Sequence, residues 1–225
     1  MKVIFLSVLI LIISILLLAC SDEDSPGKPV REERHPGLTS PALVKETAPS
    51  VFAVQFESTK GTFLVECDRE WAPNGVDRFY NLVKIGYLND IAFYRALESY
   101  IVQFGTHSDP EVTQAWSVAY IGDDPVVMPN QRGYLTFAQD APNTRTTQLF
   151  FNLTDNSEEL DPYGLAPICT VTEGTEILDL IYTGYGEMHP EGEGPRPNLL
   201  QKLGNKYLKR EFPEMDYILR TFLVE

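Results

Sequence analysis

Hydrophobic residues occur along most of this chain in many short runs, separated by glycine, proline, asparagine and aspartate. Residues 51–56 and 62–67 are rich in β-branched and aromatic side chains, and the polar stretch 58–61 between them predicts a hairpin turn. Further short strands are expected at 92–95, 100–104, 133–138, 148–152 and 168–171. Strands this short and this numerous are typical of a closed barrel.

Two segments among these strands carry helical periodicity. The first begins near Pro73, ends at Gly86 and places its apolar side chains on one face, at Val76, Phe79, Tyr80, Leu82 and Val83. A second helix is expected over 173–182, and 106–132 reads as a long connection. Isolated helices among many strands predict a closed barrel whose ends the helices cover.

The last forty residues have a different pattern. Residues 184–198 are rich in Gly, Pro and Glu and predict a loop. An amphipathic helix is expected over 199–212, ended by Pro213, and 217–224 is a candidate edge strand. We therefore treat 185–225 as a C-terminal helical extension that packs on the barrel and covers an edge.

The first twenty residues form an export signal rather than part of the fold. An unbroken apolar run follows Lys2 and ends at Ala19-Cys20, before a polar stretch. This ending resembles a bacterial lipobox, so residues 1–19 are expected to be a lipoprotein signal peptide and Cys20 the lipidated residue. The alternative is an uncleaved transmembrane helix. Residues 20–48, rich in Pro, Ser and charged residues, are expected to be a flexible tether.

Either reading places the globular part outside the cytoplasm and at a membrane. We expect a lipid-anchored protein of the bacterial cell envelope that faces the periplasm. Ser21 follows the cysteine, where an aspartate would indicate retention at the inner membrane, so the outer membrane is favoured.

Composition restricts the partners. The chain has 225 residues, 44% of them hydrophobic, which is enough for one domain with a core. Its formal net charge of −14 argues against nucleic-acid binding, which needs a basic face. Cys67 and Cys169 lie in apolar runs, and we expect buried free thiols there, with a disulfide as the alternative that export permits.

Familiar catalytic constellations are missing from the sequence. His107, Ser108 and Asp109 are adjacent in a predicted loop, whereas a catalytic triad is assembled across a fold. No cluster has metal-ligand spacing, and no glycine-rich phosphate loop follows a strand. Neither a metal nor a cofactor is expected. What remains is three polar residues on apolar strands, Arg95, Gln103 and Gln148, which either face solvent or line a cleft.

The order and spacing of several motifs resemble the cyclophilin family over roughly residues 50–184. The matching segments are 86–90 with Phe93-Tyr94-Arg95, then 100–105, 132–138, 142–152, Leu160-Asp161, 164–167 and 171–174. The resemblance implies a mainly β fold, a closed eight-stranded antiparallel barrel capped by two helices, with a peptide groove on its outer surface. The cyclophilin-like domain would span 49–184. Segments 204–208 and 212–218 resemble an extension found on some bacterial members.

The resemblance also implies roles for individual residues. Arg95 would be the catalytic arginine, and Gln103 the glutamine that orients it and the substrate backbone. The substrate-binding residues would be Tyr100, Ile101, Phe150 and Leu160 in the apolar wall around the proline ring, Ala138 and Gln139 along the substrate chain, and Gln148 in the pocket.

Several positions depart from the family pattern. Tyr100, Gln139 and Leu149 replace the usual residues, and Glu159 stands where many eukaryotic members have a tryptophan important for cyclosporin binding. The pocket histidine has no clear counterpart near Tyr163. These departures affect the expected peptide preference and cyclosporin sensitivity, and they leave Arg95, Gln103 and Gln148 in place.

The expected function is peptidyl-prolyl cis–trans isomerisation that assists the folding of exported proteins. The partners would be proline-containing peptides and unfolded exported proteins, with the chain acting as a monomer. Three alternatives remain open at this point: a non-catalytic module that binds proline peptides, an envelope interaction protein that works through 184–225, and a general chaperone. An arginine that favours the twisted amide needs no nucleophile or metal, in agreement with the missing constellations.

Overall fold

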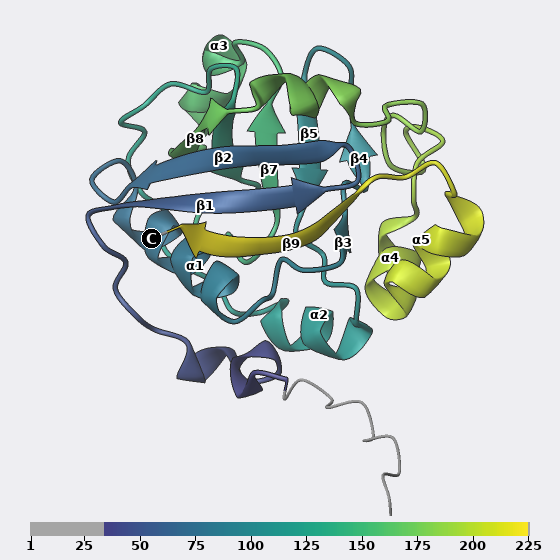
Figure 1. The fold of residues 1–225 in the computed structure, drawn as a ribbon, viewed down its shortest axis with the longest axis horizontal. Coiled ribbons are helices and arrows are strands. Elements are labelled where there is room, and N and C mark those ends of the chain that lie inside the picture. Colours follow the sequence, from purple (N-terminus) through teal and green to yellow (C-terminus); the bar gives the residue numbers. More distant parts are fainter. Residues whose placement is uncertain (1–33, 225) are drawn as a thin grey trace, which may run out of the picture. The chain divides into compact units, whose positions relative to one another are not determined.

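The computed structural model describes residues 34–224, and in this part of the chain nine strands form one curled antiparallel sheet (Figure 1). The order across the sheet is β3-β9-β1-β2-β8-β6-β7-β5-β4. The strands are β1 (Val51–Ser58), β2 (Gly61–Asp68), β3 (Ile91–Ala92), β4 (Arg95–Ala96), β5 (Ile101–Phe104), β6 (Tyr134–Phe137), β7 (Leu149–Asn152), β8 (Pro167–Glu173) and β9 (Tyr217–Val224). The mainly β fold predicted from the sequence is confirmed, with nine strands where eight were expected.

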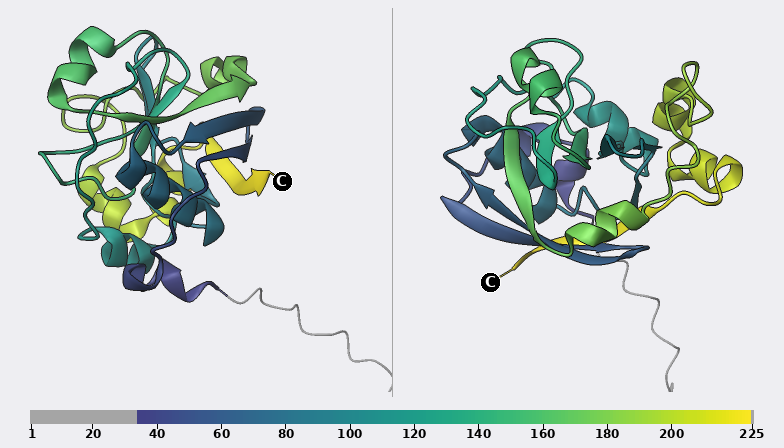
Figure 2. Two further views of the ribbon diagram at one scale, coloured as in Figure 1. Left: turned by 90° about the vertical axis from the view of Figure 1, so that its left-hand side faces the viewer. Right: turned by 90° about the horizontal axis from the view of Figure 1, so that it is seen from above.

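The two ends of this sheet meet through the chain itself. β3 and β4 stand at opposite ends of the strand order, yet only Phe93 and Tyr94 separate them in the sequence. The single strand predicted over 92–95 is therefore two strands, because Ile91 and Ala92 pair with β9 whereas Arg95 and Ala96 pair with β5. This break carries the sheet around the core, as the view from above in Figure 2 shows.

The β1–β2 hairpin follows the predicted alternation. Val54 pairs with Val65 and Phe56 with Phe63, and all four side chains are buried. Paired residues point to the same face of a sheet, so this hairpin contributes a row of apolar side chains to the core. The rings of Phe56, Phe63, Phe104 and Phe151 contact one another there.

The first predicted helix is confirmed as α1 (Pro73–Lys84), and its apolar face packs into the core of the curled sheet. The second is not: 173–182 holds only a 3₁₀ turn, Thr175–Leu180. β8 runs on to Glu173, and Gly174 then takes a left-handed conformation (φ +77°), which leaves room for a 3₁₀ helix of six residues that buries Leu178. Sequence periodicity alone does not separate such a turn from a helix.

Two short helices lie in segments for which the sequence predicted no helix. α2 (Pro110–Trp116) interrupts the connection 106–132, and α3 (Ser157–Leu160) precedes a 3₁₀ turn at Asp161–Tyr163. The Asp109 side chain accepts a hydrogen bond from Glu111 N at 2.8 Å, and Pro110 opens the helix. Aspartate followed by proline is a helix start signal, so α2 was detectable from the sequence.

The predicted C-terminal helix over 199–212 is two helices, α4 (Pro197–Leu203) and α5 (Asn205–Glu211). Gly204 separates them with φ +53°, and a Cβ at this position would lie 2.0 Å from Ser108 O. The helix breaks because the chain must pass this close to the backbone that precedes α2. Both helices pack on Ala92 and Tyr94, beside the sheet (Figure 1).

The strand predicted over 217–224 forms as β9, but it is not an edge. It lies between β3 and β1, and it is hydrogen-bonded to both. The extension is therefore part of the sheet as well as a cover for it.

Residues 34–48, assigned to the flexible tether from their composition, lie against the domain. They form 3₁₀ turns at Pro36–Leu38 and Pro41–Leu43. Leu38 is buried, and its carbonyl accepts a hydrogen bond from the Trp116 indole at 3.0 Å. Contacts from Glu46 and Ala48 to α1 complete this attachment. The predicted signal peptide, the predicted lipidation site Cys20 and the predicted tether up to residue 33 lie outside the described residues. None of the described helices has the length and hydrophobicity required to cross a membrane.

The expectation of two free thiols is wrong. Cys67 and Cys169 form a disulfide between directly paired positions of β2 and β8. Both residues are completely buried. The sequence placed them in separate apolar runs 102 residues apart, and only the register of the sheet brings them face to face.

Candidate active site

A row of side chains crosses three neighbouring strands on the outer face of the sheet. Arg95 of β4 pairs with Gln103 of β5, and Gln103 pairs with Phe150 of β7. The alternate residues of these strands, Val102 and Phe151, belong to the core. Side chains alternate between faces along a strand, so Arg95, Gln103 and Phe150 point away from the core and toward one another.

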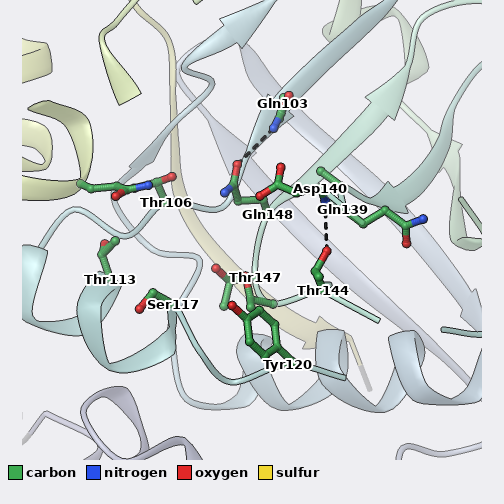
Figure 3. A pocket seen from close by; sticks show the side chains of 13 residues that line it. Gln103, Thr106, Thr113, Ser117, Tyr120, Gln139, Asp140, Thr144, Thr147 and Gln148 are labelled. Atoms are coloured by element: carbon green, nitrogen blue, oxygen red, sulfur yellow. Dashed lines mark hydrogen bonds between the residues drawn. The ribbon is translucent and has the colours of Figure 1, made fainter. Parts of the chain in front are cut away.

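Gln103 holds the arginine in this row. Nη1 of Arg95 donates to Oε1 of Gln103 at 3.0 Å, and both side chains are half-buried. The other end of the amide, Nε2, donates to Oε1 of Gln148 at 3.2 Å, an arrangement visible in Figure 3. Because the amide has a donor at one end and an acceptor at the other, one glutamine links the guanidinium to the pocket beyond it.

The hydroxyl of Tyr94 is hydrogen-bonded to both glutamines of this network. It donates to Oε1 of Gln148 at 2.5 Å and accepts from Nε2 of Gln103 at 3.2 Å. Burial raises the pKa of the Tyr94 hydroxyl, so it stays protonated and remains a donor. Sequence reasoning did not assign a role to Tyr94, although it precedes Arg95 directly. A buried tyrosine needs a partner for its hydroxyl, which was the available signal.

The predicted apolar wall is present beside the arginine. Ile101, Phe150 and Leu160 form a small buried cluster separate from the main core, with Tyr100, Ala138 and Leu165 packed against it. Ile101 lies two residues before Gln103 on β5 and so shares its face. The structure thus brings the apolar wall and the guanidinium together on one surface.

Asn130 supports this wall from behind. It is completely buried, and its Nδ2 donates to Asp161 Oδ1 and to Leu165 O, both at 2.7 Å. Its Oδ1 accepts from the Thr136 hydroxyl and from Asn152 Nδ2. Four hydrogen bonds from one side chain fix the loop that carries Leu160 and Leu165 to the strands beneath.

A polar pocket of about 230 Å³ continues the site past Gln103 (Figure 3). Gln103, Ala138, Gln139 and Gln148 line it, together with Thr113 of α2, Ser117 just after α2 and Gln201 of α4. Ala138 N donates to Gln148 O at 3.0 Å, which aligns the two predicted substrate-binding positions. The side chain of Gln139 instead donates to Tyr163 O at 3.0 Å.

A carboxylate that the sequence did not reveal completes the site. Glu187 receives two hydrogen bonds of 2.6 Å, from Nε and Nη2 of Arg95. The side chain of Arg95 is 21% exposed and that of Glu187 33%, so the ion pair is partly shielded from water. The hydrogen bonds from Arg95 lower the pKa of Glu187, which keeps it ionised. An acid in a Gly/Pro/Glu-rich loop looks like an ordinary surface residue, so the sequence offered no signal.

Tyr100 and Glu159 occupy the opposite side of the wall. The Tyr100 hydroxyl donates to Oε1 of Glu159 at 2.9 Å. Burial, reinforced by this carboxylate, raises the pKa of Tyr100 to about 12. The two family positions that depart most visibly from the expected pattern are therefore bonded to each other.

The structure brings the predicted site residues to one face. Arg95, Gln103 and Gln148 are hydrogen-bonded in series, and Tyr100, Ile101, Ala138, Phe150 and Leu160 form the adjoining wall. Gln139 lies two residues after β6 and lines the pocket. The predicted lipidation site, Cys20, lies outside the described residues.

The curled antiparallel sheet thus presents an arginine beside an apolar wall on its outer face, with a polar pocket alongside. Comparison with known proteins identifies the class. The family model "Cyclophilin type peptidyl-prolyl cis-trans isomerase/CLD" matches residues 52–198. The chain belongs to this family and is a peptidyl-prolyl cis–trans isomerase.

Curated relatives agree with the family assignment. The chain is 26% identical over 148 residues to "Peptidyl-prolyl cis-trans isomerase B" of Escherichia coli, covering 61% of this chain and 90% of that protein. It is 27% identical over 168 residues to "Peptidyl-prolyl cis-trans isomerase A" of Dickeya dadantii, covering 72% and 84%.

The fold resembles solved structures of the same class. A cyclophilin type isomerase of Cryptosporidium parvum superposes with a TM-score of 0.58 at 17% identity, covering 78% of this chain and 98% of that one. A structure of that protein in the presence of the dipeptide Ala-Pro gives 0.57 at 18% identity, covering 77% and 99%. At this identity the likeness concerns the fold alone.

Proposed function

We propose that Arg95 is the catalytic group of this isomerase, and that the enzyme acts on exported proteins while tethered to the cell envelope through a lipidated Cys20. The observation that carries the catalytic part is the row Arg95–Gln103–Phe150, in which a fixed guanidinium stands beside an apolar wall. The wall binds the proline ring, and the guanidinium faces the amide that precedes it.

The chemistry requires selective binding of a twisted amide. Rotation about a peptide C–N bond meets a barrier of about 18–20 kcal/mol, because the nitrogen lone pair is delocalised into the carbonyl. Twisting returns the lone pair to the proline nitrogen. A cation directed at that lone pair stabilises the twisted form more than either planar form, and only such a difference accelerates the reaction.

Arg95 retains donors for this task. A guanidinium has five N–H groups. Within the described residues, one binds Gln103 and two bind Glu187, which leaves one on Nη1 and one on Nη2 for the substrate. Because arginine does not lose its proton at physiological pH, the cation is present throughout the cycle.

The test is Arg95→Ala, assayed by exchange NMR on a proline peptide without a coupled protease. We expect kcat/KM to fall about 10²-fold, the scale of losing one electrostatic donor in an active site. Circular dichroism and the melting temperature establish whether the variant is folded. Undiminished activity in a folded Arg95→Ala protein would remove the arginine from the mechanism.

The export part of the proposal rests on residues 1–20 and on the cysteine pair. The apolar run that ends at Ala19-Cys20 fits a lipoprotein signal, and Ser21 favours the outer membrane. The buried Cys67–Cys169 disulfide is in keeping with an oxidising compartment such as the periplasm. The clients would then be unfolded exported chains with exposed X–Pro bonds, bound by a monomeric enzyme.

Labelled palmitate tests the anchor directly. The full chain, expressed in a Gram-negative host, should incorporate the label and sediment with outer-membrane vesicles. Cys20→Ala should abolish both. Label in the Cys20→Ala protein, or a wild type that stays in the soluble fraction, would contradict lipidation at this residue.

A further inference from the structure

Glu187 is built into the active site by the C-terminal part of the chain. Gly186, beside it, forms a bridge with Ala96, the residue that follows Arg95. The backbone carbonyl of Glu187 accepts a hydrogen bond from Gly194 N at 2.8 Å. Oε1 of the Glu187 side chain accepts one from Met188 N at 2.7 Å. The carboxylate therefore reaches Arg95 from a closed loop rather than from a free surface side chain.

Glycines make this loop possible. A Cβ at Gly192 would lie 2.4 Å from the Glu187 carbonyl oxygen, and a Cβ at Gly194 would lie 2.6 Å from it. Real Cβ atoms essentially never approach a backbone atom this closely, so a side chain at either position would force the backbone to move. The Gly/Glu-rich composition of this segment thus has a local structural reason, which is to fold the loop back onto Glu187.

The charged side chains beside the apolar wall carry a net negative charge. Arg95 and Glu187 neutralise each other across two hydrogen bonds of 2.6 Å. Glu159 stands on the other side, exposed and bonded to the Tyr100 hydroxyl. The fields of Arg95, Glu187 and Glu159 all reach Tyr100, a member of the wall. Two carboxylates against one guanidinium leave an excess negative charge where the residues flanking a bound proline must lie.

We propose that Glu187 is a specificity-determining residue, which makes this isomerase prefer X–Pro bonds flanked by lysine or arginine over those flanked by aspartate or glutamate. The proposal rests on the proposed role of the Arg95 face as the catalytic groove. Without Glu187, the guanidinium attracts acidic side chains of the substrate. With Glu187 in place that attraction is cancelled, and Glu159 adds a net preference for cations.

The magnitude follows from Coulomb's law. At a separation of about 8–10 Å through bulk water, to which the flanking side chains of a bound peptide are exposed, reversing one unit charge on the substrate changes its interaction with one fixed charge by roughly 1 kcal/mol. This corresponds to a preference of about fivefold to tenfold in kcat/KM between lysine and glutamate peptides. Salt should weaken it, because the Debye length is about 8 Å at physiological ionic strength.

The experiment measures kcat/KM by exchange NMR for matched peptides with Lys, Gln or Glu immediately before proline, and for a second set varied immediately after it. The wild type should favour Lys over Glu about fivefold to tenfold in at least one set. Glu187→Gln keeps the size and one acceptor but removes the charge, and it should bring the ratio in that set close to one or invert it.

Glu191→Gln is the matched control. Glu191 is an exposed acid of the same loop, so this variant changes the net charge equally and should keep the wild-type ratio. A wild type without a preference in either set would overturn the proposal. So would a Glu187→Gln variant that slows all peptides by one factor, which would make Glu187 a positioning residue only.

Activity on the neutral Gln peptide distinguishes a failure of the charge-selection proposal from a failure of the catalytic role proposed for Arg95. Loss of activity on that peptide in Arg95→Ala, together with a flat Lys/Glu ratio in the wild type, contradicts charge selection and leaves the catalytic role standing. Full activity of Arg95→Ala on the same peptide contradicts the catalytic role instead.

Discussion

Arg95 and Gln103 are direct partners in the β4–β5 ladder, and the side chain of one donates to that of the other at 3.0 Å. Cross-strand pairing therefore fixes both the backbone and the side chain of the proposed catalytic group. An arginine has many rotamers, and holding it in one conformation before the substrate arrives lowers the entropy that binding must otherwise remove.

Replacing Gln103 with leucine should release the arginine without unfolding the protein. Gln103 is half-buried on the outer face, and within residues 34–224 its amide bonds only to other site residues, namely Arg95, Tyr94 and Gln148. We expect Gln103→Leu to lower kcat/KM about tenfold, with a change in melting temperature of only a few degrees.

Gln131→Leu serves as the control for that variant. Gln131 is an exposed glutamine before β6, and its substitution should leave the kinetics at the wild-type level. If Gln103→Leu retained full activity, the hydrogen bond to Arg95 would have no catalytic consequence.

Asn130 gives a second prediction, on stability and substrate binding together. Asn130→Ala removes the side-chain hydrogen bonds to Asp161, Leu165, Thr136 and Asn152, and it leaves the buried Thr136 hydroxyl without this partner. We expect a loss of about 2–4 kcal/mol in the free energy of unfolding, because unpaired buried polar groups retain their desolvation cost. The loop that carries Leu160 should loosen, so KM should rise.

Denaturant titration and peptide kinetics measure these two effects. Asn198→Ala, at an exposed position of α4, is the control and should alter neither quantity. A folded Asn130→Ala protein with wild-type stability would show that the network contributes nothing net.

The parts of the fold that could be predicted are those determined by local pattern. The hairpin over β1 and β2 alternates apolar and polar residues, and α1 has a proline at its start and a glycine after its end. Arg95, Gln103 and Gln148 were found because polar residues interrupt apolar strands, and the family resemblance then assigned their roles. Each of these signals lies within about ten residues of sequence.

The parts that could not be predicted depend on contacts between distant segments. The break at Gly204 exists because α4 and α5 meet the backbone at Ser108. The disulfide depends on the register of β2 against β8. Glu187 reaches Arg95 across 92 positions, through a loop that has no periodicity of its own. In each case the local structure depends on a residue that lies far away in the sequence, outside the segment whose pattern predicts the element.

The disulfide supplies a third prediction. The Cys67–Cys169 link closes a loop with a sequence separation of 102 residues, and in the chain-entropy model a loop of about 100 residues is worth about 4–5 kcal/mol at 25 °C. We expect the double variant Cys67→Ala, Cys169→Ala to lose several kcal/mol of unfolding free energy. Its kcat/KM should stay near wild type at low temperature, because both cysteines lie among the buried core residues rather than on the groove.

Equilibrium unfolding with and without a reductant checks this. The reductant should destabilise the wild type and leave the double variant unaffected. Equal stability of the wild type in both conditions, with two free thiols detected by mass spectrometry after alkylation, would show that the cysteines are unpaired in the purified protein.

His107 makes folding stability depend on pH. Its side chain is buried against the Tyr87 ring, and Nδ1 accepts a hydrogen bond from Asp109 N at 2.9 Å. Burial, assisted by Arg34, lowers the pKa of His107 to about 4. In the unfolded chain a histidine titrates near 6.5. Between these values the unfolded state binds a proton that the folded state does not, so stability rises with pH across this window.

The stabilisation is complete above about pH 6.5 and is lost progressively as the pH falls toward 4, by up to roughly 3 kcal/mol. His107→Asn should flatten this dependence, because the amide oxygen can still accept from Asp109 N and does not titrate. Denaturant unfolding of both proteins between pH 4.5 and 7 measures the difference, since carboxylates contribute alike to the two curves. Wild-type and variant curves that run parallel over this range would mean that His107 has the same pKa in the folded and the unfolded state.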